Sequence, residues 1–365
     1  MAIDFPSSPT TGQTYTTSSG VTWIWDGVKW TATGAAAPLV LPMNDNRVIN
    51  GDMRIDQRNG GASGTASGYT VDRWAYAASV AGKGTWARNL GGAATIQTGF
   101  LYYLGFQSSS AYASLAGDVF VFRQPIEADM VGDFAFGQPN AQPVTLSFWA
   151  YSNLTGTFSG AINGAATRSY PFTFSIPAAN VWTRAAITIP GDTSGAWVLS
   201  GNGIGATVMF DLGNGSTFRG PANAWASADY RGVTGAVSAV ATNAAFFLVT
   251  GVKLEIGSVA TPFNRQSLAK SMADCQRYYY QGEIAYLANF PSGVTAGTTL
   301  FFPAIMRAVP TIASISQATF GGGGFPVRTA VYINNSANGV VWGGVTTSAQ
   351  GGGGFRDTVS ASAEL

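Results

Sequence analysis

The sequence has no histidine and a single cysteine, Cys275, among its 365 residues. Without histidine there is no Ser-His-Asp triad, no Cys-His pair and no histidine-ligated zinc site. One thiol can form neither an intrachain disulfide nor a cysteine-only metal site. These absences favour a protein that is not an enzyme and that needs no cofactor.

Charge is also scarce, since Asp, Glu, Lys and Arg make up 10% of the chain and the net charge is +1. The 19 Lys and Arg residues are scattered, so the basic stripe of a nucleic-acid-binding protein is missing. No apolar run approaches the roughly 18 residues of a transmembrane helix, so membrane insertion is not expected. Because 46% of the residues are hydrophobic, a monomer with so few charges would be poorly soluble. We therefore expect other copies of the chain, or a larger assembly, to cover much of its surface.

Residues 1–34 are predicted to form a small module around a hairpin. Two β-rich runs, residues 21–25 and 28–31, flank the pair Asp26-Gly27. Such a pair between β-rich runs is typical of a tight hairpin turn, because both turn residues must adopt positive φ.

Three tryptophans of this module, Trp23, Trp25 and Trp30, need cover, because two strands alone are marginally stable in water. Either other copies or an anchoring protein cover them, or they form a small aromatic core of their own. The following residues 35–43 contain two prolines and are predicted to be a stiff linker.

Residues 44–263 are predicted to form one large jelly roll or β-sandwich. Short β-rich runs recur there, separated by clusters of Gly, Asn, Pro and Ser. Within residues 145–150 the alternation is regular, which predicts an inward face of Leu146, Phe148 and Ala150 and an outward face of Thr145, Ser147 and Trp149.

Residues 264–281 are predicted to form a connecting helix that Ser267 caps. Its apolar positions follow a spacing of four, three and four, which places on one face Leu268, Met272, Cys275 and Tyr279. This face could lie on the sandwich or at a subunit axis, since the spacing also suits a coiled-coil seam.

Residues 282–365 are predicted to form a second, smaller β-sandwich rich in glycine. Two runs of four glycines, within residues 320–325 and 350–355, repeat at a 30-residue interval. Glycine loses more backbone freedom on ordering than any other residue, so both runs are predicted to be loops.

Three passages carry a resemblance to a known family. They are GQTY and GVTWIWDGVKW in residues 12–30, NRVINGDMRIDQR and YTVDRW in residues 46–74, and VKLEIGSVATPF and CQRYY in residues 252–279. In this order and spacing they resemble tailed-bacteriophage fibre proteins, whether tail or head fibres. The second and third are similar to the opening and closing of the carbohydrate-binding-module-like jelly roll of such fibres. Beyond residue 280, Met306-Arg307 and Pro310-Thr311 are also typical of them.

The resemblance implies a homotrimeric structural protein at the virion surface. It implies attachment to other virion proteins through residues 1–34, with Trp23, Trp25 and Trp30 as anchors, and recognition of a host-surface glycan. The predicted helix face that begins at Leu268 is the candidate trimer contact, because its spacing suits a coiled-coil seam. Residues 1–6 lack the features of a signal peptide, so we expect synthesis in the bacterial host cytoplasm. One alternative is a capsid or tail decoration protein with a purely structural role.

A weaker alternative is a polysaccharide depolymerase, which needs two carboxylates about 5–9.5 Å apart. Asp52 with Asp56, and Glu127 with Asp129, are close in the sequence, but neither pair belongs to a catalytic motif.

Binding of a sugar requires an aromatic ring that stacks on its apolar face and polar groups that read its hydroxyls. The candidates are Trp149 and Tyr151 in one β-rich run, and Trp182 beside a predicted loop; ordinary packing is the alternative for each. Carbohydrate-binding jelly rolls often carry a structural calcium near their first and last strands, where Asp52 and Glu255 fall in this sequence. The alternative for these two carboxylates is a surface or turn position without metal.

Overall fold

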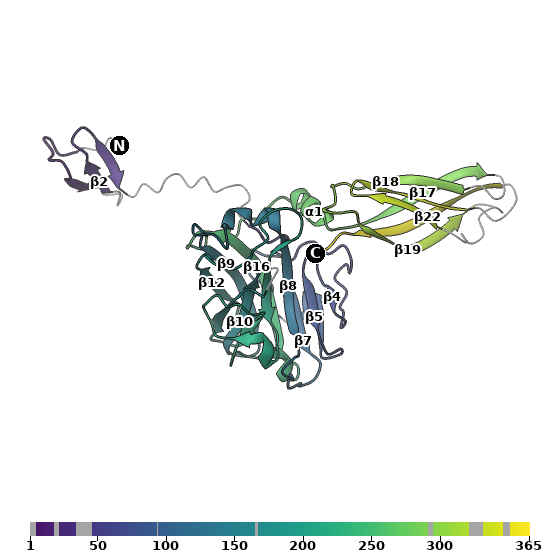
Figure 1. The fold of residues 1–365 in the computed structure, drawn as a ribbon, viewed down its shortest axis with the longest axis horizontal. Coiled ribbons are helices and arrows are strands. Elements are labelled where there is room, and N and C mark those ends of the chain that lie inside the picture. Colours follow the sequence, from purple (N-terminus) through teal and green to yellow (C-terminus); the bar gives the residue numbers. More distant parts are fainter. Residues whose placement is uncertain are drawn as a thin grey trace. The chain divides into compact units, whose positions relative to one another are not determined.

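The computed structural model describes residues 5–17, 22–33, 46–92, 94–164, 167–290, 295–320, 331–345 and 351–365. The chain separates into two compact units, Met1–Asp45 and Asn46–Leu365 (Figure 1). The predicted linker, residues 35–43, lies outside the described residues. Both units are built from β-sheets, so the predicted all-β class is confirmed.

The first unit is a three-stranded antiparallel sheet of β1 (Thr14–Thr16), β2 (Thr22–Trp25) and β3 (Trp30–Thr33). The predicted hairpin is present, but its turn has four residues, not two. The Asp26 carboxylate accepts hydrogen bonds from the N–H groups of Val28 and Lys29, both at 2.8 Å. These bonds place Val28 and Lys29, the start of the second β-rich run, in the turn, and Gly27 adopts the positive φ, 105°.

The aromatic side chains of this unit pack on one another. Phe5 stacks on Trp30 with ring centroids 5.1 Å apart and meets Trp23 edge-on at 5.3 Å. Trp25 lies 5.7 Å from Trp30. The unit thus has a small aromatic core of its own, although Trp23, Trp25 and Trp30 stay half-buried.

Two antiparallel sheets form the large sandwich of the second unit (Figure 1). One has six strands, in the order β11 (Ser169–Ile176), β10 (Gly156–Asn163), β13 (Ile204–Asp211), β8 (Phe120–Glu127), β5 (Ala75–Ala78) and β4 (Gly68–Tyr69). The other has five, in the order β12 (Thr183–Ile189), β9 (Val144–Ser152), β16 (Phe246–Ile256), β7 (Leu104–Ser108) and β6 (Gly84–Arg88). Most neighbouring strands are distant in sequence, as in a jelly roll.

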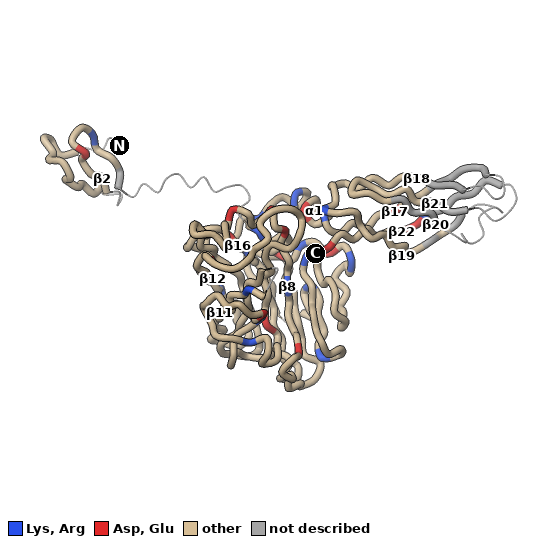
Figure 2. The backbone as a smooth tube through the Cα atoms, in the orientation of Figure 1, with Lys and Arg blue, Asp and Glu red and all other residues tan. Residues whose placement is uncertain are grey.

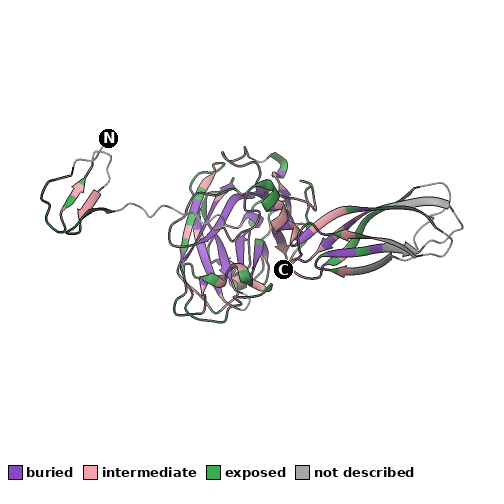
Figure 3. Cartoon of the chain, turned by 90° about the horizontal axis from the view of Figure 1, so that it is seen from above, coloured by how far each residue is buried: buried purple, intermediate pink, exposed green. Residues whose placement is uncertain are grey.

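The core lies between these two sheets, whose strands are largely buried (Figure 3). The predicted inward residues of β9, Leu146, Phe148 and Ala150, all belong to this core. Phe148 meets Phe210 of the facing sheet with ring centroids 4.9 Å apart. Each buried aromatic of this kind stabilises the fold by roughly 1.5–3 kcal/mol.

Short elements complete the sandwich. A parallel pair joins β14 (Arg219–Gly220) to β15 (Gly232–Val233). The 3-10 turns are η1 (Leu90–Gly92), η2 (Ala128–Met130), η3 (Gly132–Phe134), η4 (Ser216–Phe218) and η5 (Ala239–Ala241). No helix in the described part of the chain has the length and apolar character needed to cross a membrane.

The passages that open and close the sandwich lie against each other. Asn46 donates from Nδ2 to the Val252 carbonyl oxygen and accepts from the Leu254 N–H through Oδ1, both at 3.0 Å. The Val252 N–H donates to the Gly51 carbonyl oxygen at 2.9 Å. A Cβ at position 51 would lie 2.1 Å from the Val252 oxygen, so only glycine permits this approach.

The connecting helix α1 (Leu268–Gln276) is shorter than the predicted span of residues 264–281. Ser267 caps it as predicted, since its Oγ accepts from the Lys270 N–H at 3.3 Å. A turn at Arg277 and Tyr278 follows the helix, and the Arg73 guanidinium lies over the Tyr278 ring, 3.5 Å from its centroid. Tyr279 begins a strand, where it pairs with Ser362 of β22, and does not belong to the helix face on which it was predicted.

The predicted second sandwich is present and consists of two three-stranded sheets. One contains β17 (Tyr279–Phe290), β22 (Gly351–Ser362) and β19 (Thr311–Phe320), and the other β18 (Thr295–Phe301), β21 (Gly339–Val345) and β20 (Val331–Ser336). Both contribute to one core, which includes Trp342 and Val359.

One glycine run is a strand and not the predicted loop. Gly351 to Gly354 begin β22, where each pairs with a residue of β17. Gly354 also pairs with Phe320 of β19 on the other side. Hydrogen bonds from neighbouring strands thus compensate for the backbone entropy that glycine loses. The other run, residues 321–324, lies outside the described residues.

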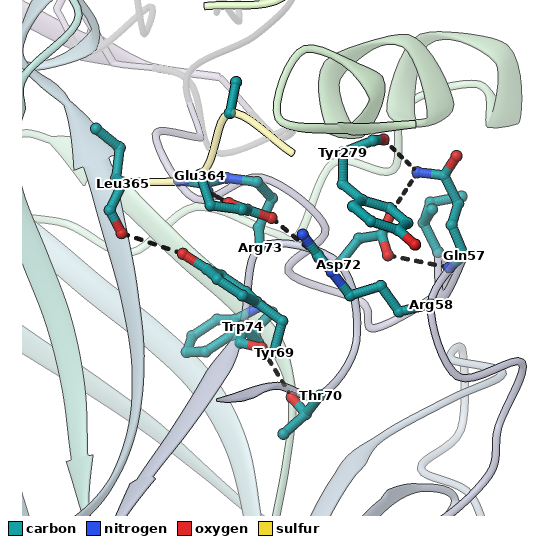
Figure 4. Close-up of polar contacts among 12 residues, drawn as sticks. Gln57, Arg58, Tyr69, Thr70, Asp72, Arg73, Trp74, Tyr279, Glu364 and Leu365 are labelled. Carbon is teal, nitrogen blue, oxygen red and sulfur yellow. Dashed lines mark hydrogen bonds and ion pairs between the residues drawn. The ribbon is translucent and has the colours of Figure 1, made fainter. Parts of the chain in front are cut away.

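A buried cluster of polar and aromatic side chains joins the two sandwiches (Figure 4). The Arg73 side chain, 1% exposed, forms an ion pair with Glu364. Gln57 donates from Nε2 to the Tyr279 carbonyl oxygen at 2.9 Å and binds the Asp72 carboxylate. Burial raises the pKa of Asp72, against the hydrogen bonds from Gln57. Residues of the passage at 46–74 therefore hold the second sandwich in place.

Candidate functional site

A pocket of about 310 Å³ opens on the outer face of the five-stranded sheet. Strands β9, β12 and β16 form its floor, and the chain after β16 forms one wall. The lining residues are Ser147, Phe148, Trp149, Arg184, Gly251, Ala260, Pro262 and Phe263.

A bulge in β16 shapes one side of the pocket. The register of β16 against β9 shifts between Thr250 and Lys253. Within the bulge Gly251 has φ 64°, and a Cβ there would lie 2.5 Å from the Phe100 ring. Phe100 in turn meets Phe263 edge-on, with ring centroids 5.3 Å apart. The glycine therefore allows two aromatic rings to close this side of the pocket.

Hydrogen bonds fix the wall that follows β16. The Glu255 carboxylate accepts from the Thr261 N–H at 2.8 Å and pairs with the Lys253 ammonium at 3.1 Å. Thr145 of β9 donates from Oγ1 to the Gly257 carbonyl oxygen at 2.7 Å. The buried Lys253–Glu255 pair leaves no net charge beneath the pocket.

Trp149 lies on β9 between Arg184 of β12 and Thr250 of β16, its two cross-strand neighbours. Among the described residues it makes no ring-to-ring contact, and its indole N–H donates to none of them. The other tryptophans of the second unit all donate their indole N–H to a protein acceptor; these are Trp74, Trp86, Trp182, Trp197, Trp225 and Trp342. The half-buried Trp149 is thus the tryptophan of this unit whose indole N–H has no acceptor among the described residues, and its side chain lines the pocket.

Arg184 is exposed beside Trp149 and makes no hydrogen bond or ion pair among the described residues. Charged residues are sparse along the backbone (Figure 2). Twelve of the fourteen described arginines bind a carboxylate or a carbonyl oxygen; only Arg184 and Arg123, which lies on β8 of the other sheet, do neither. None of the described residues that line the pocket is acidic.

The other two predicted sugar ligands lie in a covered aromatic cluster on the same face. Trp182 lies 5.3 Å from Tyr151 and 5.8 Å from Tyr103, measured between ring centroids. Trp182 donates its indole N–H to the Thr95 carbonyl oxygen at 2.8 Å, and Tyr151 is only 7% exposed. Neither lines the pocket, so the structure separates them from Trp149.

The two predicted calcium ligands each face a cation of the protein. Asp52 lies 3.1 Å from the guanidinium of Arg265 and 3.7 Å from that of Arg54. Glu255 is paired with Lys253. Among the described residues no three acidic, histidine or cysteine side chains gather into a group that could hold a metal ion.

The four residues of the predicted trimer face differ in their exposure. Leu268 is 55% exposed and Met272 is half-buried, whereas Cys275 and Tyr279 are buried within the chain. Only the first two therefore remain accessible to another copy.

The acid pairs considered for catalysis are occupied by structural contacts. Glu127 pairs with Arg277 at 2.8 Å, and Asp129 accepts from the Gly201 N–H. Asp56 accepts from the N–H groups of Asn59 and Gly61.

The sequence patterns did not predict the pocket residues Arg184, Gly251 and Phe263. Arg184 stands at an alternate position of a β-rich run, which signals an outward side chain. Its place beside Trp149 follows only from the pairing of β12 with β9.

No protein-family model matches the sequence, and no curated protein matches it. Among solved structures, it is similar to the enzymatically active domain of tailspike protein 4 of bacteriophage CBA120, at 14% identity over 58% of this chain and 22% of that one, with a TM-score of 0.31. A CBM4 structure is 11% identical over 57% of this chain and 98% of its own, with a TM-score of 0.30. The family 11 carbohydrate-binding module from Clostridium thermocellum, in complex with a mixed-linked tetrasaccharide, is 10% identical over 55% and 98%, with a TM-score of 0.27.

Proposed function

We propose that this chain is a non-catalytic saccharide-binding protein of a bacteriophage fibre, and that its large sandwich holds a host-surface glycan in the pocket at Trp149. The observation that carries the proposal is the pairing, at one pocket, of a tryptophan and an arginine that have no polar partner among the described residues. Trp149 offers a ring face and an N–H donor, and Arg184 offers guanidinium donors. A sugar ring presents an apolar face and hydroxyl groups, which these two side chains match.

The pocket volume, about 310 Å³, lies at the lower end of ligand pockets, which span roughly 300–1,000 Å³. It therefore suits a single sugar residue or a short glycan segment. Because the pocket lies on the rigid face of a sheet, little binding energy is needed to order it.

The fibre context and the homotrimer rest on the sequence passages and on exposed apolar surface. The second sandwich exposes Phe301, Ile305 and Val309 at 75%, 65% and 63%. Exposed apolar side chains of this size favour contact with other copies or other virion proteins. Light scattering of the purified chain is expected to give three times the monomer mass; a monomer at micromolar concentration would contradict the trimer.

Trp149→Ala tests the saccharide site. We expect wild-type protein to bind host-derived polysaccharide and the variant to bind it at least about tenfold more weakly, a loss of about 1.4 kcal/mol. Leu115→Ala, which removes a 69% exposed apolar side chain of the same sandwich outside the pocket, is the control and should bind as wild type. Equal binding by wild type and Trp149→Ala would contradict the site. Release of reducing ends from the polysaccharide would contradict the absence of catalysis.

A further inference from the structure

We propose that the saccharide bound at the Trp149 pocket is acidic and that Arg184 binds its carboxylate. This inference rests on the proposed function, since it names the class of sugar that the same pocket takes. The charge of the residues that line the pocket supports this inference. The described lining residues include one guanidinium and no carboxylate, and the nearby Lys253–Glu255 pair is neutral as a whole.

Arg184 differs from most other described arginines of this chain because it has no polar partner among the described residues. An arginine in this chain nearly always has a partner, as Arg168 has in Asp192 and Arg219 has in Asp211. Arg184 lies on β12, opposite Trp149, and has none among the described residues. A planar guanidinium forms two parallel hydrogen bonds with a carboxylate, a geometry that a neutral hydroxyl group cannot offer.

The positions of the two side chains fit one acidic sugar residue. Directly opposed residues on neighbouring strands have Cβ atoms about 4.5–5.5 Å apart. A sugar ring stacked on Trp149 would therefore bring a carboxylate on its edge within reach of the Arg184 side chain. The wall of Pro262 and Phe263 carries no charged group that would compete for the carboxylate.

The test uses an array of bacterial surface polysaccharides of known composition. Each uronate-containing polymer is printed twice, in native form and after carbodiimide–borohydride reduction of its carboxylates to alcohols, and neutral and phosphate-bearing polymers are printed beside them. The full-length wild-type chain is expected to bind native uronate polymers at least about tenfold more tightly than their reduced forms. Raising the salt to about 1 M should remove most of this difference, because the Debye length falls to about 3 Å.

Two variants test whether Arg184 causes this difference in binding between native and reduced polymers. Arg184→Gln should bind native polymers only as tightly as wild type binds the reduced ones. Arg123→Gln, the matched change on the other sheet, should bind as wild type does. Thermal unfolding of both variants checks that they are folded; because each side chain is exposed and makes no ion pair within the described part of the chain, neither change should lower the melting temperature.

The outcomes separate the inference from the proposed function. Equal binding of native and reduced polymers, abolished by Trp149→Ala, would overturn the acidic ligand and leave the saccharide site standing. Preference for phosphate-bearing polymers alone would overturn the carboxylate. Absence of binding to every polymer would contradict the proposed function itself.

Discussion

Asp192 shows at the scale of one residue how this chain uses its few charges. Arg168 donates to its carboxylate from Nε at 2.6 Å, and Trp197 donates from its indole nitrogen at 2.9 Å. Burial alone would raise the pKa of Asp192, but these hydrogen bonds outweigh it and hold the pKa below its ordinary value of 3.8. A folded-state pKa below the unfolded one means that the carboxylate stabilises the fold above about pH 4, and that this stability is lost as the pH falls through the lowered pKa.

Asp192→Asn should therefore lower the free energy of unfolding by about 3 kcal/mol at pH 7, because it leaves a largely buried guanidinium without its counter-charge. Urea unfolding at several pH values measures this loss. The difference in the free energy of unfolding between wild type and Asp192→Asn should narrow below pH 4. Asp229→Asn breaks a more exposed pair with Arg231 and should cost less than about 1 kcal/mol. A gap that stays constant down to pH 2 would contradict the assigned role of Asp192.

Cys275 makes a second prediction at this scale. Burial, together with the nearby Asp72, raises the pKa of its thiol well above the ordinary value, and the side chain is fully buried. Since the thiolate is the reactive form, Ellman's reagent at pH 8 should label the folded protein only at the rate at which it opens. Labelling in urea should be immediate. Rapid labelling in native buffer would show that the Cys275 thiol is accessible in the folded protein.

At the scale of the element, the bulge of β16 is the feature that shapes the pocket. Gly251→Ala would place a methyl group against Phe100 in addition to straining a positive φ. Gly60 has a similar φ, 57°, and a Cβ there would meet nothing within 4 Å, so Gly60→Ala isolates the backbone strain of about 1–2 kcal/mol. We expect Gly251→Ala to lose more stability than Gly60→Ala in thermal unfolding and also to weaken saccharide binding. Equal losses of stability without a change in binding would show that the contact with Phe100 does not shape the pocket.

Sequence patterns correctly predicted the features that depend on residues close together in the sequence. The alternation in β9 correctly assigned Phe148 to the core, and the Ser267 cap correctly began α1. Non-local contacts decided the rest. Gly351 to Gly354 form a strand because they pair with β17, and Tyr279 belongs to a strand because it pairs with Ser362 of β22.

The candidate site divides in the same way. Trp149 could be predicted because alternation places it on the outer face of its own strand. Its neighbour Arg184 could not, because their contact depends on the register between two strands about 35 residues apart along the chain. The covered state of Tyr151 likewise depends on Trp182 and Tyr103, which come from other segments.

At the scale of the whole molecule, the second unit is two sandwiches with a charged junction between them. The junction gathers Arg58, Arg73 and Glu364 from segments about 300 residues apart (Figure 4). The Arg73 guanidinium lies over the Tyr278 ring, and that of Arg58 over the Tyr279 ring at 3.7 Å. Two cations share one carboxylate here, so the aromatic faces supply the remaining negative potential.

Glu364→Gln tests whether this junction holds the two sandwiches together. It would leave two buried guanidinium groups without a counter-charge, and we expect a loss of about 3–5 kcal/mol in the free energy of unfolding. Glu283→Gln is the matched control, because its pair with Arg356 lies in the same sandwich with side chains 54% and 60% exposed; it should cost less than about 1 kcal/mol. Denaturant unfolding followed by tryptophan fluorescence measures both. Similar small losses of unfolding free energy in both variants would mean that apolar contacts are enough to hold the two sandwiches together. A large loss confined to Glu364→Gln would mean that the two ion pairs of this carboxylate contribute much of the free energy that holds the large sandwich to the second one.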